Sequence, residues 1–316
     1  MKLLGLMNSR SNVKYDDVIF LYKVLLNREP ENQNVVSEKL RNRSFQETIS
    51  EFVKSKEYQE KFFNSFSNKI DYKINSLDFE KLTERLVHQW QMLGSKKPYW
   101  SVISDPKFMP SEIEKHSDEF WASGDNTICE IFKKCDEFNL EINKKSIGLE
   151  LGAGVGRLSF PLSKRISKLL ALDVSPGNLS ILQASKQASK QASKIQPILI
   201  SSFEQFKTFS NIDFFLSLIT LQHNPPPLQI FILQNIFKSM NIYAVGVFQV
   251  PIHTPHFTFN TQAFLDGSAS EMDMFSLPID KIFEICRESN VSIVHVEQDN
   301  LAGPKHLSCT FYVQKR

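Results

Sequence analysis

Two short apolar segments that each end in an acidic residue could together hold a nucleoside-bearing cofactor. The first segment ends at Glu150 and the second at Asp173. Three alternate glycines follow the first segment: Gly152, Gly154 and Gly156. Glycine lets a backbone turn tightly and approach a ligand closely, because no Cβ is in the way. A carboxylate at the end of the second strand can accept hydrogen bonds from ribose hydroxyl groups. The spacing therefore predicts a strand–helix–strand unit for cofactor binding.

The residue that follows these glycines separates two classes of cofactor. The dinucleotide fingerprint G-x-G-x-x-G has its third glycine where this chain has Arg157. A pyrophosphate binds at a helix N-terminus with open space behind it, and this loop lacks the glycine that opens that space. The carboxylate of Glu150 suits the ammonium group of a methionine moiety instead. A nicotinamide-dependent oxidoreductase is therefore disfavoured, while a non-catalytic protein that keeps a cofactor fold as a scaffold stays an alternative.

The stretch Glu-Leu-Gly-Ala-Gly-Val-Gly-Arg at 150–157 resembles motif I of the class I S-adenosylmethionine-dependent methyltransferases. Leu-Asp-Val-Ser-Pro at 172–176 resembles their second-strand motif, and the resemblance covers residues 98–313. It implies S-adenosyl-L-methionine as the cofactor. It also implies that the Ser-Phe-Glu segment at 202–204 lies where class I enzymes contact adenine. The cofactor-binding residues expected from the resemblance are Glu150, Gly152, Gly154, Gly156, Arg157, Asp173, Phe203, Glu204 and Gln222.

A polar cluster follows the fourth predicted strand and precedes three prolines, in the sequence Thr-Leu-Gln-His-Asn-Pro-Pro-Pro at 220–227. It is similar to a Leu-Gln-His-Asn-Pro motif of one bacterial methyltransferase subgroup. The resemblance places His223 in the active site as the catalytic residue, either as a base or as a substrate contact. The alternative is a helix entry that Asn224 caps and the prolines stiffen.

Further residues are candidates for the acceptor pocket because they lie in stretches that resemble the same subgroup. Aromatic residues ahead of the glycine loop form a lid over the cofactor or anchor the core. The irregular segment after the fifth predicted strand has Glu-Met-Asp at 271–273 where the subgroup has Glu-Met-His. The candidates for the acceptor pocket are Trp100, Trp121, Asn224, His253 and Asp273. The histidines have irregular spacing and no adjacent acid cluster, so no metal site is expected.

Apolar segments alternate with helical patterns from residue 146 to the end of the chain. Strands are predicted at 146–151, 168–173, 197–201, 212–219, 242–250, 291–298 and 307–314. Strand–helix alternation favours a parallel sheet with right-handed crossovers, and the last two strands are close enough to form an antiparallel hairpin. The expected fold is α/β, a seven-stranded Rossmann-like methyltransferase sheet preceded by a small all-helical N-terminal module.

The N-terminal segment has apolar residues at helical spacing. Its Arg-Glu-Pro at 28–30 and Ser-Lys-Glu-Tyr at 55–58 resemble a helical accessory module often attached to bacterial glycosyltransferases and methyltransferases; an ordinary bundle for packing or dimerisation is the alternative. We divide the chain into an accessory module at 1–66, a helical lead-in or lid at 67–145 and an S-adenosylmethionine-binding domain at 146–316. The polar stretch 64–69 is typical of a domain boundary, so residues from Ile70 onward are expected to fold without the module.

Composition limits the partners and the location. The 316 residues carry a net charge of +2, which disfavours nucleic acid as a partner. No apolar run approaches the roughly 20 residues of a membrane span, and the first apolar run is too short for a signal peptide. The four cysteines show neither metal-type nor secreted-scaffold spacing. We therefore expect a cytoplasmic protein, and its oligomeric state is left open. The resemblance to the methyltransferases implies a small-molecule or glycan acceptor, and the resemblance to the accessory module implies a role in cell-surface polysaccharide biosynthesis. A Gln-Ala-Ser-Lys repeat at 183–194 is expected to be a solvated helix end.

Overall fold

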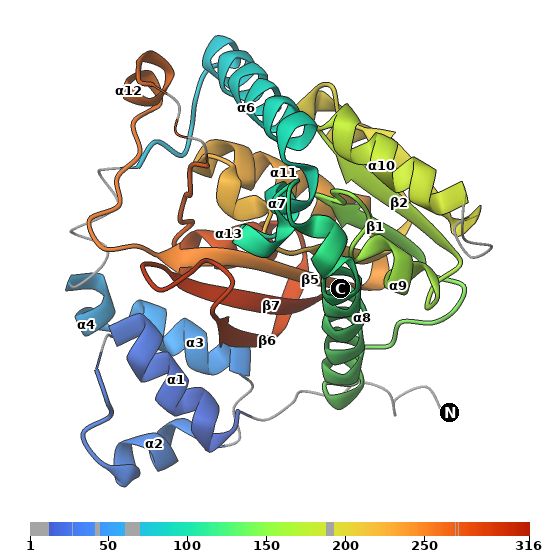
Figure 1. Ribbon diagram of the computed structural model, residues 1–316. Helices are drawn as coiled ribbons and strands as arrows, with labels where there is room; N and C mark the ends of the chain where they lie inside the picture. The colour runs from blue at the N-terminus through green and yellow to red at the C-terminus, as the bar shows by residue number, and fades with distance from the viewer. Residues whose placement is uncertain are drawn as a thin grey trace.

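A mixed sheet of seven strands occupies the centre of the computed structural model (Figure 1). The structure describes residues 13–26, 28–41, 45–60, 70–187, 193–268, 270 and 272–316. The strand order is β3-β2-β1-β4-β5-β7-β6, and β7 pairs antiparallel with both of its neighbours. The strands are β1 Ile147–Leu151, β2 Lys168–Asp173, β3 Ile195–Leu199, β4 Ile212–Ser217, β5 Met240–His253, β6 Val291–Asp299 and β7 Leu307–Lys315. The predicted α/β fold class is confirmed.

Helices precede the sheet and cover both of its faces. Those before the sheet are α1 Tyr15–Leu26, α2 Gln33–Lys39, α3 Phe45–Lys54, α4 Lys56–Tyr58, α6 Ser76–Lys96, α7 Pro98–Val102, η2 Pro106–Phe108 and α8 Ile113–Glu137. Those between or after the strands are α9 Ser159–Ser163, α10 Pro176–Gln187, η4 Phe203–Thr208, η5 Leu221–His223, α11 Pro226–Ser239, α12 Thr261–Asp266 and α13 Ile279–Glu288. Among the described ranges, no helix combines the length and the apolarity that crossing a membrane requires.

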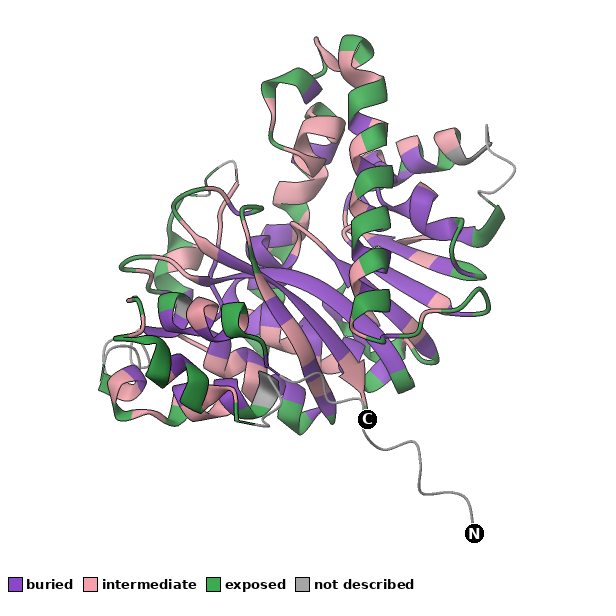
Figure 2. Cartoon of the chain, turned by 90° about the horizontal axis from the view of Figure 1, so that it is seen from below, coloured by how far each residue is buried: buried purple, intermediate pink, exposed green. Residues whose placement is uncertain are grey.

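Side chains alternate between the two faces of the sheet, as the two-residue period of a strand requires. Phe215 belongs to the cluster that includes buried residues of α11 and α13. Its neighbours Phe214 and Leu216 belong to the opposite cluster, with residues of α8, α9 and α10. All three are fully buried, and burial of each contributes about 1.5–3 kcal/mol. Figure 2 shows the buried sheet between helices that expose their outer sides. Two packed faces make the sheet a rigid platform for the loops at its ends.

The predicted strands match the observed ones except at some boundaries. The third strand begins at Ile195, two residues earlier than the predicted start at Pro197. Proline is tolerated there because β3 lies at the edge of the sheet. The fifth strand begins at Met240 rather than Ile242, since Met240 already pairs with Ile212 of β4. The first copy of the Gln-Ala-Ser-Lys repeat lies in α10, as expected, while residues 188–192 lie outside the described residues.

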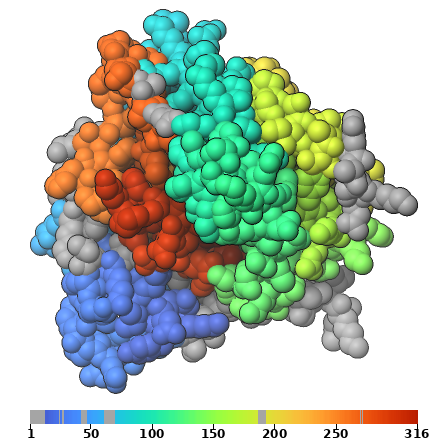
Figure 3. All heavy atoms as spheres, viewed as in Figure 1, coloured from blue at the N-terminus to red at the C-terminus, as the bar shows by residue number. Residues whose placement is uncertain are grey.

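The helices α1 to α4 lie beside the outer strand β6 (Figures 1 and 3). Leu21 and Phe52 of these helices belong to the same buried cluster as Val291 and Ile293 of β6. The proposed boundary at residue 66 lies outside the described residues. The shared cluster shows that the N-terminal helices cover apolar surface of the sheet.

Removal of residues 1–69 is therefore expected to destabilise the remainder, in contrast to the expectation from the sequence. Exposure of the β6 cluster costs several kcal/mol at about 25 cal/mol per Å², so we expect an unfolding temperature at least about 5 °C lower and aggregation on heating. Differential scanning calorimetry checks this, with a chain that starts at Val13 as the control. An unchanged unfolding temperature in the shorter chain would instead support a separable module.

Candidate functional site

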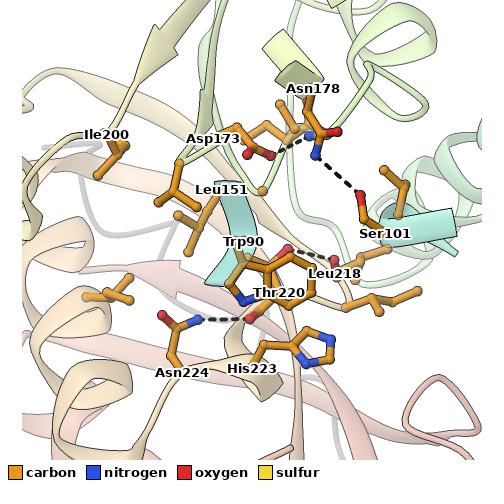
Figure 4. A pocket seen from close by; sticks show the side chains of 18 of the residues that line it. Trp90, Ser101, Leu151, Asp173, Asn178, Ile200, Leu218, Thr220, His223 and Asn224 are labelled. Carbon is orange, nitrogen blue, oxygen red and sulfur yellow. Dashed lines mark hydrogen bonds between the residues drawn. The ribbon is translucent and has the colours of Figure 1, made fainter. Parts of the chain in front are cut away.

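A cavity opens at the carboxyl ends of β1, β2 and β4. The strand order reverses there, since β2 lies on one side of β1 and β4 on the other. Open α/β sheets bind their ligands at this reversal, beyond the strand ends. The loops after the three strands form one wall, and α6 and α7 contribute Leu86, Trp90, Ser101 and Val102 to the other. Figure 4 shows Trp90 and Ser101 around the cavity together with Asp173, Thr220 and His223.

The loop after β1 forms the floor of the cavity and needs glycine for two reasons. Gly154 has a φ of +55°, in the left-handed region that side chains rarely adopt. A Cβ on Gly154 would lie 2.5 Å from Cγ2 of Val102, and a Cβ on Gly152 would lie 2.0 Å from Oγ1 of Thr220. Gly152 and Gly154 line the cavity, whereas Gly156 packs against Phe160 outside its wall. The glycines therefore let α7 and the loop after β4 close onto the floor.

Asp173 ends β2 and faces the cavity. Its Oδ2 accepts a hydrogen bond from the Gly154 amide at 2.7 Å, and its Oδ1 accepts one from the Ser175 amide at 2.7 Å. Burial raises the pKa of this carboxyl to about 6, against the opposing effect of these amides, so it is mainly ionised at pH 7. A carboxylate has about four acceptor sites. Asp173 can therefore still accept the two hydroxyl groups of a ribose.

Glu150 and Arg157 place two buried ionisable side chains in the lining of the cavity. Glu150 is 2% exposed and its Oε2 accepts a hydrogen bond from the Ser159 hydroxyl at 2.6 Å. Burial raises the pKa of Glu150 to about 8 and lowers that of Arg157 to about 10. Arg157 Nη1 donates to Ser123 Oγ at 3.3 Å, and its buried Nε has no partner. This guanidinium has fewer acceptors than a buried cation requires, so it suits an anionic group of a ligand.

His223 lies in η5 and faces the cavity across from the glycine loop. Its Nδ1 lies 2.9 Å from the carbonyl oxygen of Asp273; a carbonyl only accepts, so Nδ1 carries the ring proton. The Nε2 then accepts from the side-chain amide of Gln222 at 3.1 Å. Burial lowers the pKa of His223 to about 4. The indole of Trp90 packs against the ring, with centroids 4.8 Å apart. His223 is therefore a neutral group in a fixed orientation.

The turn between β4 and His223 contains a strained residue. Ile219 lines the cavity with a φ of +56°, a conformation that a β-branched side chain disfavours by about 1–2 kcal/mol. Its amide donates to Oε1 of Gln249 at 2.9 Å rather than to a neighbouring strand. Strain of this kind is concentrated at functional sites.

Some of the predicted cofactor contacts lie apart from the cavity. Phe203 lines the cavity, whereas the next residue, Glu204, is exposed and forms an ion pair with Lys207 at 2.6 Å. Glu204 lies instead in a second hollow beside α6. The side chain of Gln222 is buried outside the cavity lining, where it contacts Nε2 of His223. These positions leave the loops after β1 and β2, together with Phe203, as the candidate cofactor contacts.

Of the residues predicted for the acceptor pocket, some line the cavity and others lie away from it. Asn224 lines the cavity, and its Nδ2 donates to the Thr220 carbonyl. Trp100 lies beneath the Lys97 ammonium, and Trp121 packs edge-on against Phe120, as a core anchor would. Asp273 acts through its backbone carbonyl on His223, while His253 is half-buried at the end of β5. Glu271 lies outside the described residues.

Sequence reasoning missed several groups of the site. Trp90 lies within a long amphipathic helix, where its spacing indicates only packing. Asn178 lines the cavity from the first turn of α10, and its Nδ2 donates to Ser101 Oγ at 3.4 Å. In the described part of the chain, no group of three or more His, Cys, Asp or Glu residues is arranged to hold a metal ion.

Comparisons with known proteins show the fold. No protein-family model matches the sequence, and neither does any curated protein. The magnesium protoporphyrin IX methyltransferase from Synechocystis PCC 6803 with bound SAH is 14% identical and matches 73% of this chain and 100% of its own, with a TM-score of 0.50. A SAM-dependent methyltransferase from Leishmania major is 13% identical and matches 77% of this chain and 88% of its own, with a TM-score of 0.53. The chain therefore has the fold of these methyltransferases.

Proposed function

We propose that the protein is an S-adenosylmethionine-dependent methyltransferase that acts on a small molecule or a glycan. One observation carries the proposal: the glycine loop, the Asp173 carboxylate with free acceptor sites, and the buried Glu150 carboxyl and Arg157 guanidinium line the same cavity at the reversal of strand order. The fold supports it, because the similar Synechocystis structure holds SAH. The resemblance of the N-terminal helices to modules attached to glycosyltransferases favours a glycan acceptor.

The residues of the cavity fit the parts of this cofactor one by one. Asp173 accepts the ribose hydroxyls, and Phe203 packs against the adenine. Glu150 would accept from the methionine ammonium, and the unpartnered Nε–H of Arg157 would donate to the methionine carboxylate. When bound, the cofactor would supply a methyl group attached to a positively charged sulfur. Because the sulfur departs as a neutral thioether, no acid is needed to assist the leaving group. The remaining tasks of the chain are alignment of the acceptor and exclusion of water.

His223 and Asn224 are the polar groups that we assign to the acceptor. Both lie on the loop after β4, and Trp90 of α6 packs against the imidazole. The neutral imidazole can take a proton from a hydroxyl acceptor when the Gln222 amide releases Nε2. We place the reaction in the cytoplasm, where S-adenosylmethionine is made.

Titration calorimetry tests the cofactor assignment directly. We expect binding of S-adenosylhomocysteine and S-adenosylmethionine at micromolar strength and no binding of NAD. Asp173→Ala is expected to weaken the binding of S-adenosylhomocysteine by about 1–3 kcal/mol, because the ribose hydroxyls lose their acceptor. Binding of NAD in place of S-adenosylhomocysteine would contradict the proposal.

Glu150 makes the binding reaction depend on pH. Because burial raises the pKa of Glu150 to about 8, its carboxyl is mainly protonated at pH 7 before the ligand binds. An adjacent ammonium favours the ionised form, so the pKa falls on binding and a proton is released. Affinity should therefore rise as the pH rises from 6 to 8 and level off above 8. Calorimetry in buffers of different ionisation enthalpy measures the release, and Glu150→Gln should abolish it. Proton uptake at pH 7 would contradict this assignment.

A further inference from the structure

Gln249 lies in β5, away from the cavity, yet its side chain connects two elements of the cavity wall. It is fully buried, and each of its hydrogen-bonding groups has a partner. Oε1 accepts from the Ile219 amide at 2.9 Å. Nε2 donates to Gln222 Oε1 at 3.0 Å and to Ser308 Oγ at 2.5 Å. A fully satisfied buried polar network of this kind specifies one geometry, since each lost bond leaves a buried group unpaired.

The bond to Ile219 maintains the left-handed turn in the cavity wall. No strand neighbour takes this amide, so Gln249 provides the partner that the strained conformation needs. Without it, the turn can relax to a conformation that isoleucine prefers. The side chain of Ile219 and the following Thr220 would then move relative to the cavity that they line.

The bond to Gln222 determines which end of that amide faces His223. Because Gln249 donates to the carbonyl oxygen of Gln222, the NH2 group of Gln222 faces the imidazole. If Gln222 turned over, its oxygen would face Nε2. The ring would then need two N–H groups, since Nδ1 already donates to Asp273. Such a ring is the imidazolium. The orientation of Gln222 therefore keeps His223 neutral.

We propose that Gln249 is a positioning residue of this site, which holds the Ile219 turn with its carbonyl and orients Gln222 against His223 with its amide. The second part gains its catalytic meaning from the proposed function, but the geometry itself does not depend on it. The other titratable groups around His223 are Asp273, whose Oδ1 accepts from Ser270, and the Glu150, Arg157 and Asp173 side chains that line the same cavity.

The experiment compares Gln249→Met, which keeps the length of the side chain but removes both polar groups, with Val245→Ala. Val245 is fully buried in the same strand and lies outside the cavity wall, so the control reproduces a loss of stability alone. Calorimetry measures affinity for S-adenosylhomocysteine, and nuclear magnetic resonance of labelled histidine measures the pKa of His223, assigned with a His223→Phe spectrum. Gln249→Asn, which is too short to reach both partners, replaces the methionine variant if that one does not fold.

In Gln249→Met we expect about a tenfold loss of affinity and a rise of at least one unit in the pKa of His223, because Gln222 is free to turn its oxygen toward the ring. Val245→Ala should change affinity less than twofold and leave the pKa unchanged. Addition of Ile219→Gly to Gln249→Met should bring the affinity close to that of Ile219→Gly alone, because glycine adopts a positive φ without support. The raised pKa should persist.

Two results would overturn the inference. Behaviour of Gln249→Met like Val245→Ala in both measurements would remove any positioning role. A double variant that binds much more weakly than Ile219→Gly alone would remove the role at Ile219, because the loss would then have another cause. If the unaltered protein does not bind S-adenosylhomocysteine, the proposed function fails, and the pKa of His223 still decides whether Gln249 orients Gln222.

Discussion

Gly154→Val is expected to abolish binding of S-adenosylhomocysteine, with a rise of at least roughly 10³-fold in the dissociation constant. The new Cβ would lie 2.5 Å from Cγ2 of Val102, and valine disfavours the observed φ of +55°. The backbone must therefore shift, and with it the amide that donates to Oδ2 of Asp173. The substitution distorts the floor of the cavity and displaces the amide that positions Asp173, the residue that we propose for the ribose.

Gly303→Val provides a matched control for this effect. Gly303 also has a positive φ, of +77°, but a Cβ there would meet nothing within 4 Å. It lies in the loop between β6 and β7, outside the cavity wall. Both substitutions impose backbone strain, so circular dichroism should show a loss of thermal stability in both, and a larger one in Gly154→Val because of its clash with Val102. Only the Gly154 variant should lose the ligand in calorimetry. Equal affinities in the two variants would show that the cofactor binds elsewhere.

The sequence predicts the floor of this site because its determinants are local. The apolar strand, the acid, the glycines and the second acid lie within one strand–helix–strand unit at 147–173, and pairing of β1 with β2 brings both acids to one edge of the sheet. The spacing of these residue types is therefore enough to predict that the acids and the glycines meet at one edge of the sheet. Gly156 shows where this reasoning fails, since its Cβ would meet Phe160 rather than a ligand.

The other wall of the site could not be predicted in the same way, because its contacts join distant parts of the chain. His223 is oriented by the carbonyl of Asp273, fifty residues later. The bond between Arg85 and the carbonyl of Leu265 joins α6 to the segment after β5 over a still longer separation. Neither bond depends on a side-chain pattern in the acceptor residue, since any residue carries a backbone carbonyl.

Local conformation explains the division between Phe203 and Glu204. Both were predicted from the place of their segment in the sheet, yet they lie in a 3-10 helix in which adjacent side chains point in different directions. Ser202 and Gln205 form a capping box that fixes the start of this helix. The phenyl group is therefore directed into the cavity and the carboxylate outward. The position of the segment in the sheet does not by itself indicate which of the two side chains points inward.

His223→Ala is expected to lower the turnover rate by roughly 10²–10⁴-fold while affinity for S-adenosylhomocysteine changes less than about twofold. The neutral imidazole faces the cavity beside Asn224, and the lone pair on its Nε2 accepts a hydrogen bond from the Gln222 amide, which the hydroxyl of an acceptor would have to replace. Turnover is measured with a hydroxyl acceptor found by screening transfer of radiolabelled methyl groups. His88→Ala is the control, since His88 is exposed on α6 and lies outside this cavity.

The pH dependence of turnover distinguishes a catalytic base from a residue that only supports the loop. A base acts when it is unprotonated, and burial lowers the pKa of His223 to about 4. If His223 is the base, the turnover rate should therefore be constant from pH 6 to pH 8 and decline only as the pH approaches 4. With an imidazole at its ordinary pKa of about 6.5, the turnover rate would already fall between pH 7 and pH 6. If His223→Ala loses cofactor affinity as well, the ring supports the loop instead. If neither turnover nor affinity changes, the proton must go to another group, and Asp273, whose buried Oδ2 has no partner, becomes the residue to test.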